Sequence, residues 1–170
     1  MTATVGAPPL ILAGEDGWVE VREPVNYDEF SAIYDLRRRV FGEELGMVEA
    51  GVSDADDSRS THAVATFHRG MGYSPRPVAT GRLTFGVGPN GAALITWVAT
   101  LPGYRRRGIG EAVMRFLLDT ADRAGAQVVV LSAQARAMPF YRRLGFMPYG
   151  QRFTVRGVEH QPMARMRREA

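Results

Sequence analysis

The sequence predicts a mixed α/β (α+β) domain whose sheet is largely antiparallel. Segments that alternate apolar and polar residues are interspersed with segments whose apolar residues recur every three or four positions. Their order is a strand, a helical segment, three strands, a helix, a strand, a helix and two strands, which is typical of such a domain. A chain of 170 residues fits one domain with a substantial core.

The N-terminal segment begins without periodicity. Residues 1–16 are rich in Ala, Gly and Pro, so we expect a flexible tail there and a single domain over residues 17–170. Residues 18–22 alternate and predict the first strand. A helix is expected next, capped by Asn26 or Asp28, with apolar positions at Phe30, Ile33, Leu36, Val40 and Phe41.

The middle of the chain predicts three successive strands. Gly46 is expected to end the first helix, and residues 51–60 carry aspartates without an apolar pattern, which indicates a surface loop. The three strands then cover residues 62–68, 78–85 and 93–99, with Pro-Asn-Gly at 89–91 in the last connection.

The C-terminal half alternates helices and strands. A helix is predicted from residue 108 to about 124, with Gly125 in the C′ position. A strand apolar on both faces follows, and a short helix then begins at Pro139, where the missing N–H costs nothing. Gly145 ends that helix, and the last two strands cover residues 146–153 and 158–166.

Composition limits the class of protein. The formal net charge is +3 and the pI about 9.7, but the arginines are too scattered to make nucleic acid the expected partner. No apolar run is long enough for a membrane span, and no signal peptide is expected. The chain has no cysteine, which excludes thiol catalysis, and we expect it in the cytoplasm. No His/Asp/Glu spacing suggests a metal.

One stretch has the features of a phosphate-binding turn. The apolar run at residues 97–101 leads through Pro102-Gly103 and three arginines to Gly108 and Gly110, where a helical pattern begins. The first amides of a helix have no internal acceptor, and glycines let the backbone approach an anion closely. A tight turn without a ligand is the alternative interpretation.

The spacing Arg105-x-x-Gly108-x-Gly110 resembles the acyl-CoA pyrophosphate loop of the GNAT superfamily of N-acetyltransferases. A second signature of that superfamily matches about 30 residues later, at Gln134, Ala137, Phe140, Tyr141, Gly145 and Phe146. The resemblance implies an open sheet of six to seven strands flanked by about four helices, with the fourth and fifth strands splayed apart.

A narrower resemblance is to the ElaA-type branch of the superfamily. It is carried by the Arg37-x-x-Val40-Phe41-x-x-Glu44 stretch, and also by Asp54, Asp57, His62, Gln134 and the Gly157-Val158-Glu159-His160-x-x-Met163 stretch. Acyl-homoserine-lactone synthases share a similar Arg-x-x-Val-Phe opening and are distant relatives to keep in view.

The resemblance implies acetyl-CoA as co-substrate. Its pyrophosphate is expected on the amides of Arg105, Arg106, Arg107, Gly108, Ile109 and Gly110, and its pantetheine arm on the freed backbone of Val98, Ala99 and Thr100. The side chains of Arg106 and Arg107 either add charge or are solvated. Gln134 is expected to bind the cofactor arm, with a helix N-cap as the alternative.

Tyr141 matches the tyrosine that protonates the departing thiolate in many relatives, and a phenol can donate that proton at neutral pH. A packing tyrosine beside Phe140 is the alternative. The general base is open, because Val129 stands where some relatives carry a glutamate.

Candidates on the acceptor side are Glu44, Asp57, His62 and His160, with Arg37 as a partner for Glu44 or Asp57. His62 has a suitable side chain for a base, but a structural hydrogen bond is its commoner role. Arg37 borders the apolar face of the first helix and either fixes the acceptor-side loop or points to solvent.

We therefore expect direct transfer of an acetyl group from acetyl-CoA to a small-molecule amine or a protein amino group, by a monomer or homodimer. A non-catalytic acyl-CoA-binding or sensing domain on the same fold is the alternative. Nucleic-acid binding is the least supported, because stacking aromatics do not cluster with the arginines.

Overall fold

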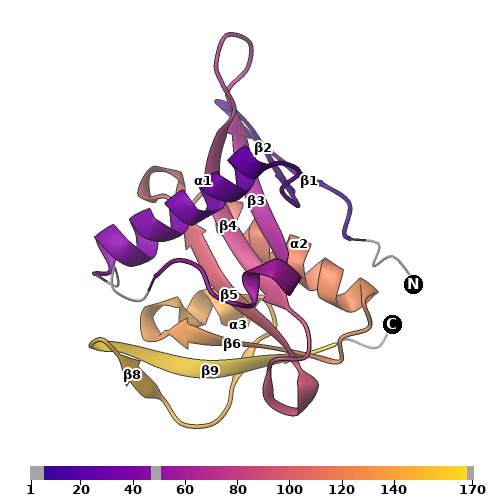
Figure 1. Cartoon of the computed structure of the whole chain (residues 1–170), viewed down its shortest axis with the longest axis vertical. Helices are drawn as coiled ribbons and strands as arrows, with labels where there is room; N and C mark the ends of the chain where they lie inside the picture. The colour runs from indigo at the N-terminus through magenta and orange to yellow at the C-terminus, as the bar shows by residue number, and fades with distance from the viewer. Residues whose placement is uncertain (1–5, 47–50, 168–170) are drawn as a thin grey trace.

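The structure, a computed structural model, describes residues 6–46 and 51–167 (Figure 1). Within these residues one sheet has the strand order β1-β2-β3-β4-β5-β6-β9-β7, and β8 pairs with β9. The strands are β1 (Leu10–Gly14), β2 (Gly17–Arg22), β3 (Thr61–His68), β4 (Arg76–Thr84), β5 (Ala93–Thr100), β6 (Val128–Gln134), β7 (Met147–Pro148), β8 (Phe153–Val155) and β9 (Val158–Met166). The α-helices are α1 (Tyr27–Arg37), α2 (Ile109–Arg123) and α3 (Met138–Arg143).

The predicted fold class is confirmed. All paired neighbours in the sheet are antiparallel except β5 and β6, which run parallel. The described sheet has nine strands where six to seven were expected, and the helical elements are three α-helices and one π-helical segment, η1 (Arg38–Glu44), besides short 3-10 turns. Figure 1 shows α1 crossing one face of the sheet and α2 lying on the other.

The prediction of a flexible tail over residues 1–16 is wrong for residues 10–14. These residues form β1, an edge strand that pairs with β2 through a short turn. Leu10 and Leu12 pack against the core while Ile11 faces solvent, so the segment has the alternation of a half-buried strand. Gly17 closes the turn with φ 152°, and a Cβ there would lie 2.2 Å from the carbonyl oxygen of His68. Residues 1–5 lie outside the described part.

The first helix begins as predicted at Asn26, whose side chain accepts a hydrogen bond from the amide of Glu29 at 2.9 Å. The helical winding continues past Arg37 into η1, and Gly46 then takes a left-handed conformation with φ 68°. The chain is thereby carried to the end of β5, where Phe41 contacts Trp97.

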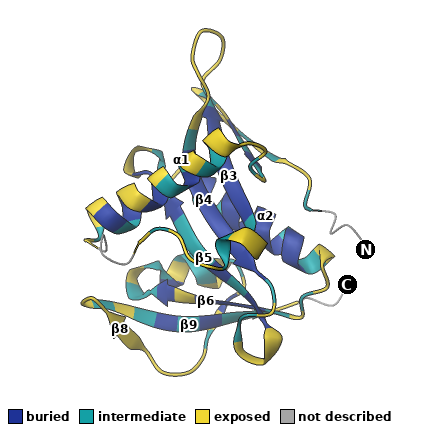
Figure 2. Ribbon diagram, in the orientation of Figure 1, coloured by how far each residue is buried: buried dark blue, intermediate teal, exposed yellow. Residues whose placement is uncertain are grey.

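The core lies between the sheet and α2, and it is the darkest part of the ribbon in Figure 2. The helix packs so closely on β4 that a Cβ at Gly81 would lie 2.9 Å from Leu117 and 3.0 Å from Val113. This contact fixes the start of α2, and with it the preceding loop, relative to the central strands.

Two irregularities open the sheet beside this loop. Strand β5 pairs with β6 at only two positions, Ala93↔Val129 and Leu94↔Val130. The pairing of β4 with β5 shifts register between Thr80 and Arg82, and Trp97 there has φ 56°. Such a bulge bends a strand and redirects its side chains. The backbone of β5 beyond Leu94 therefore has no register partner in β6.

The first of the last two predicted strands is divided. Residues 146–153 were expected to be continuous, but β7 and β8 are separated by a bend in which Gly150 has φ 62°. A two-residue turn joins β8 to β9, and both of its residues, Arg156 and Gly157, have positive φ, as such a turn requires.

Candidate active site

A cavity of about 590 Å³ lies where β5 and β6 diverge. Its walls come from β5, the loop that starts α2, the end of β6, α3 and η1. Of the residues predicted to bind the cofactor, those lining it are Val98, Ala99, Thr100, Arg105, Arg106, Gly108, Ile109, Gly110 and Gln134. The structure thus brings together two motifs that are about 30 residues apart in the sequence.

The loop before α2 has the geometry of an anion-binding nest. Arg106 and Gly108 both have positive φ, at 63° and 77°. Gly108 is the N-cap of α2 and has no side chain that could accept a hydrogen bond. The first amides of this 15-residue helix, which lies beside the cavity, therefore have no side-chain cap. Successive amides in such a conformation, at the positive end of a helix dipole, bind phosphate oxygens.

Arg105 and Arg107 leave this nest in different directions. Arg105 donates from Nε to the carbonyl oxygen of Thr100 at 2.9 Å, and its two terminal nitrogens bind the carboxylate of Glu44 at 2.7 and 2.6 Å. The hydrogen bonds from Arg105 lower the pKa of Glu44. Arg107 does not line the cavity; it pairs with Asp16 in the β1–β2 turn. Glu44, predicted on the acceptor side, is therefore tied to the donor loop.

Tyr141 lines the cavity from α3, opposite β5. Its ring meets Phe140 and Phe146 edge to face, at centroid distances of 5.0 and 6.0 Å. Burial raises its pKa to about 12, so the phenol stays protonated at any physiological pH. No hydrogen-bond partner for the hydroxyl is found in the described residues, so the proton is not committed to a structural bond.

Gln134 stands at the end of β6, where the backbone turns into the 3-10 turn η6 (Ala135–Ala137). It occupies the cap position of that turn, but its side chain makes no capping hydrogen bond. Its Oε1 accepts from Nε of Arg136 at 3.3 Å. Gln134 therefore lines the cavity without capping the turn.

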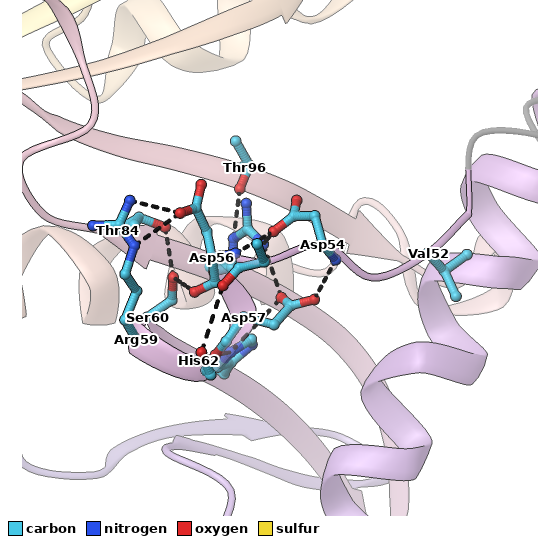
Figure 3. Close-up of polar contacts among 12 residues, drawn as sticks. Val52, Asp54, Asp56, Asp57, Arg59, Ser60, His62, Thr84 and Thr96 are labelled. Carbon is cyan, nitrogen blue, oxygen red and sulfur yellow. Dashed lines mark hydrogen bonds and ion pairs between the residues drawn. The ribbon is translucent and has the colours of Figure 1, made fainter.

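Arg37, Asp57 and His62 meet away from the cavity in a buried cluster (Figure 3). Arg37 is fully buried and donates to Asp57 at 3.0 Å and to the carbonyl of Val52 at 2.9 Å. His62 contacts the carbonyl of Asp57 at 2.8 Å and Arg37 at 3.3 Å, so both ring nitrogens are engaged. None of the three predicted acceptor-side residues lines the cavity.

Arg82 completes this cluster and was not predicted. From β4 it donates to Asp57 at 2.8 Å and to Asp54 at 2.6 Å, and it is 3% exposed. Burial would raise the pKa of Asp57, but hydrogen bonds from Arg82, the amide of Asp54 and Arg37 outweigh it and lower that pKa. One feature of the sequence points to this role: Arg82 lies inside the otherwise uncharged strand predicted at residues 78–85. Arginine is rarely buried unless it is paired with an acidic residue.

The cluster lies directly behind one wall of the cavity. The guanidinium of Arg37 stacks over the Trp97 ring at 5.0 Å and over Tyr34 at 5.3 Å. Trp97 is the residue of the β5 bulge and lines the cavity. The buried charges thus support the wall from behind rather than reaching the reacting groups.

His160 is the fourth acceptor-side candidate, and it does line the cavity. It is half-buried on β9, in register with Gln134 of β6. Its Nδ1 lies 2.9 Å from the carbonyl oxygen of Val158, and its ring stacks on Phe153 at 5.5 Å.

Two other kinds of site were sought within the described ranges. No three His, Asp or Glu side chains there come close enough together to hold a metal ion. Among those same ranges, no helix combines the length and apolar character that crossing a membrane demands.

Comparisons with known proteins identify similar sequences. Residues 85–166 match the family model described as an acetyltransferase (GNAT) domain. YjcF of Bacillus subtilis (strain 168), named as an uncharacterized N-acetyltransferase, is 26% identical over 139 residues, which cover 81% of this chain and 93% of that protein.

Solved structures share the fold. The crystal structure of Escherichia coli ElaA superposes with a TM-score of 0.72 at 22% identity, covering 92% of this chain and 99% of that one. An acyl-CoA N-acyltransferase from Pseudomonas aeruginosa superposes with a TM-score of 0.67 at 26% identity, covering 86% and 97%.

Proposed function

We propose, from the premise that this chain carries a GNAT acetyltransferase domain, that it transfers an acetyl group from acetyl-CoA to an amine acceptor. One observation carries the proposal: the cavity at the β5–β6 divergence joins a phosphate-binding nest to a protonated tyrosine. A long, flexible donor with phosphates at one end and a thioester at the other fits such a cavity. The ElaA-type branch is proposed from the same motifs, and the ElaA fold is consistent with it.

The donor side is proposed to work as follows. The amides from Arg105 to Gly110 hold the pyrophosphate. The stretch of β5 from Val98 to Thr100, which has no register partner in β6, binds the pantetheine arm and polarises the thioester carbonyl. A Cβ at Gly110 would lie 3.4 Å from Oγ1 of Thr100, so glycine keeps this approach open. Gln134 contributes both a donor and an acceptor to the same arm.

The chemistry is proposed to be direct attack in a ternary complex. The acceptor nitrogen forms a bond to the carbonyl carbon, the C–S bond breaks, and Tyr141 gives its proton to the thiolate. A cysteine acyl-enzyme is excluded because the chain has no cysteine. The pKa of about 12 keeps the Tyr141 proton available until a strongly basic thiolate develops nearby.

The proposal is tested by CoA release from acetyl-CoA with a panel of acceptors: spermidine, aniline and a peptide with a free N-terminus and one lysine. A thiol reagent can follow release without background from the protein, which has no cysteine. Acetyl-CoA should also raise the thermal midpoint, because it binds only the folded state.

The outcomes separate the two candidate functions. Release with at least one acceptor supports the transferase. A thermal shift without release across the panel favours an acyl-CoA-binding domain, and the absence of both contradicts the donor site.

A further inference from the structure

Of the acceptor-side candidates, Glu44 and His160 line the cavity, and Glu44 is held in an ion pair with Arg105. The carboxylate of Glu44 binds Arg105 with both oxygens. One carboxylate oxygen of Asp57 is shared by Arg37 and Arg82, and the other accepts the amide of Asp54. Asp57 therefore stabilises the fold outside the cavity, and Glu44 is held in an ion pair with the loop before α2.

His62 is excluded on similar grounds. Both of its ring nitrogens are engaged, it is 3% exposed, and it does not line the cavity. Burial lowers its pKa, which matches a neutral imidazole packed for structure. The remaining cavity carboxylate, that of Glu111, binds Arg115 one turn along α2.

The hydrogen bond at Nδ1 fixes the tautomer of His160. A carbonyl oxygen only accepts, so the contact of Nδ1 with the Val158 carbonyl places the hydrogen on Nδ1. In the neutral ring, Nε2 then carries the lone pair. No partner for Nε2 is found in the part of the chain that the structure describes.

Two neighbouring side chains hold the ring in place. Residues directly opposite in an antiparallel pair share a face, and His160 lies opposite Gln134 on one side and Phe153 on the other. The Phe153 ring lies nearly parallel to the imidazole, at an interplanar angle of 14°. Ser132, on the same face of β6, is exposed, so this face is open to an incoming acceptor.

We propose that His160 is the general base, taking a proton at Nε2 from the acceptor ammonium; this inference rests on the proposed transferase function. The freed amine lone pair forms the C–N bond, the C–S bond breaks, and the thiolate takes the proton of Tyr141. The second amine proton goes to solvent, and the proton on His160 returns to Tyr141 through solvent. The balance is one ammonium and one acetyl-CoA giving one amide, one CoA thiol and one proton.

The charged side chains that line the cavity together with His160 are Glu44, Glu111, Arg105, Arg106, Arg136 and Arg143. Strands β6, β7 and β8, which pair with β9, contain no ionisable side chain, and η6 contributes Arg136. On β9 itself, the carboxylate of Glu159 binds Arg152 at 2.6 Å. Across the cavity, Glu44 and Arg105 neutralise each other. A change in the rate–pH profile on substituting His160 would therefore report the imidazole itself.

The test is His160→Asn, which keeps a donor for the Val158 carbonyl and removes the Nε2 lone pair. With spermidine as acceptor, kcat/KM at neutral pH should fall about 100-fold, the usual scale of general-base catalysis. The rate of the variant should then rise with pH as more of the acceptor is present as free amine. With aniline, which is uncharged near neutral pH, the loss should be less than about tenfold. Affinity for acetyl-CoA should not change.

Each outcome decides a separate question. Equal turnover in variant and wild type overturns the base assignment, and so does an equal loss with both acceptors, since that indicates a structural role. If wild type neither binds acetyl-CoA nor releases CoA, the proposed function fails and this inference with it. Thr154→Ala on exposed β8 is the control, and His160→Gln replaces the Asn variant if that variant does not fold.

Discussion

The two sides of the cavity are built in different ways. The proposed donor side consists mainly of backbone: a helix N-terminus, two residues with positive φ and a stretch of β5 with no register partner in β6. The wall behind Trp97 is supported by side-chain charge, with Arg37, Asp57 and Arg82 buried together. A site built from backbone depends on local sequence. The charge cluster instead depends on Arg37 and Arg82, which are separated from Asp57 by 20 and 25 positions in the sequence.

This difference determines what a mutation on each side should do. Replacing one member of a buried charge cluster leaves its partners unpaired, so the penalty appears in folding. Replacing a residue of the loop changes a surface that faces a ligand, so the penalty should appear in binding or turnover. The predictions below test that separation.

The largest effect is expected for Asp57→Asn. The variant leaves Arg37 and Arg82 buried without their shared carboxylate, and should lower the free energy of unfolding by about 3–5 kcal/mol. Urea unfolding at neutral pH measures it. Asp56→Asn, which breaks only an exposed pair with Arg59, should cost less than about 1 kcal/mol. Similar losses in the two variants would contradict the distinction.

Tyr141→Phe should lower kcat about 100-fold, since the thiolate loses its proton donor. Affinity for acetyl-CoA and the unfolding free energy should stay close to wild type, because the hydroxyl has no partner among the described residues. CoA release and isothermal titration measure the two quantities. Tyr149→Phe, outside the cavity, is the control, and unchanged turnover in Tyr141→Phe would rule out the acid.

A smaller effect is expected for Gly108→Ala. The left-handed conformation at φ 77° costs an L-residue about 1–2 kcal/mol, which should weaken acetyl-CoA binding about tenfold as the nest distorts. Gly103→Ala is a matched control in the same loop, where an added Cβ meets no atom within 4 Å and φ is not positive. Equal affinities for the two variants would show that the nest does not bind the donor.

The pH dependence of stability should follow the cluster rather than the loop. The folded-state pKa is lowered for both His62 and Asp57, so the unfolded chain binds more protons and acidification favours unfolding. The His62 contribution is lost as pH falls below about 6.5, and that of Asp57 below about 3.9.

Urea unfolding at a series of pH values tests this dependence. The slope just below pH 6.5 should be shallower in His62→Gln than in wild type. The same slope in both proteins would assign the dependence to other groups.

The same contrast explains what the sequence could predict. Gly108, Gly110 and Tyr141 lie in local motifs, and the structure gathers them around one cavity as the resemblance implies. Arg37 pairs with Asp57, which was one of its two predicted partners, but the burial of this pair with His62 away from the cavity depends on the pairing of β3 with β4. Arg82 was missed because no local pattern shows that two aspartates from a distant loop cover it.

Errors in the fold have a similar origin. The division between β7 and β8 depends on the bend at Gly150, and residues around it carry no clear alternation. Strand β1 was missed because its short apolar run is surrounded by Ala, Gly and Pro, whose composition outweighed the Leu-Ile-Leu pattern. Residues 10–14 are held in a strand by their pairing with β2, which the sequence of β1 alone does not indicate.

That first strand reaches the donor loop, since Asp16 in its turn binds Arg107, and Leu12 lies 3.7 Å from the position of a Cβ at Gly108. Tightening the loop around a phosphate should therefore also tighten the sheet edge. Amide hydrogen exchange in residues 10–14 should slow when acetyl-CoA binds, although no atom of β1 lines the cavity. Hydrogen exchange at the N-terminal edge of the sheet would then report whether acetyl-CoA is bound, and this measurement needs no acceptor.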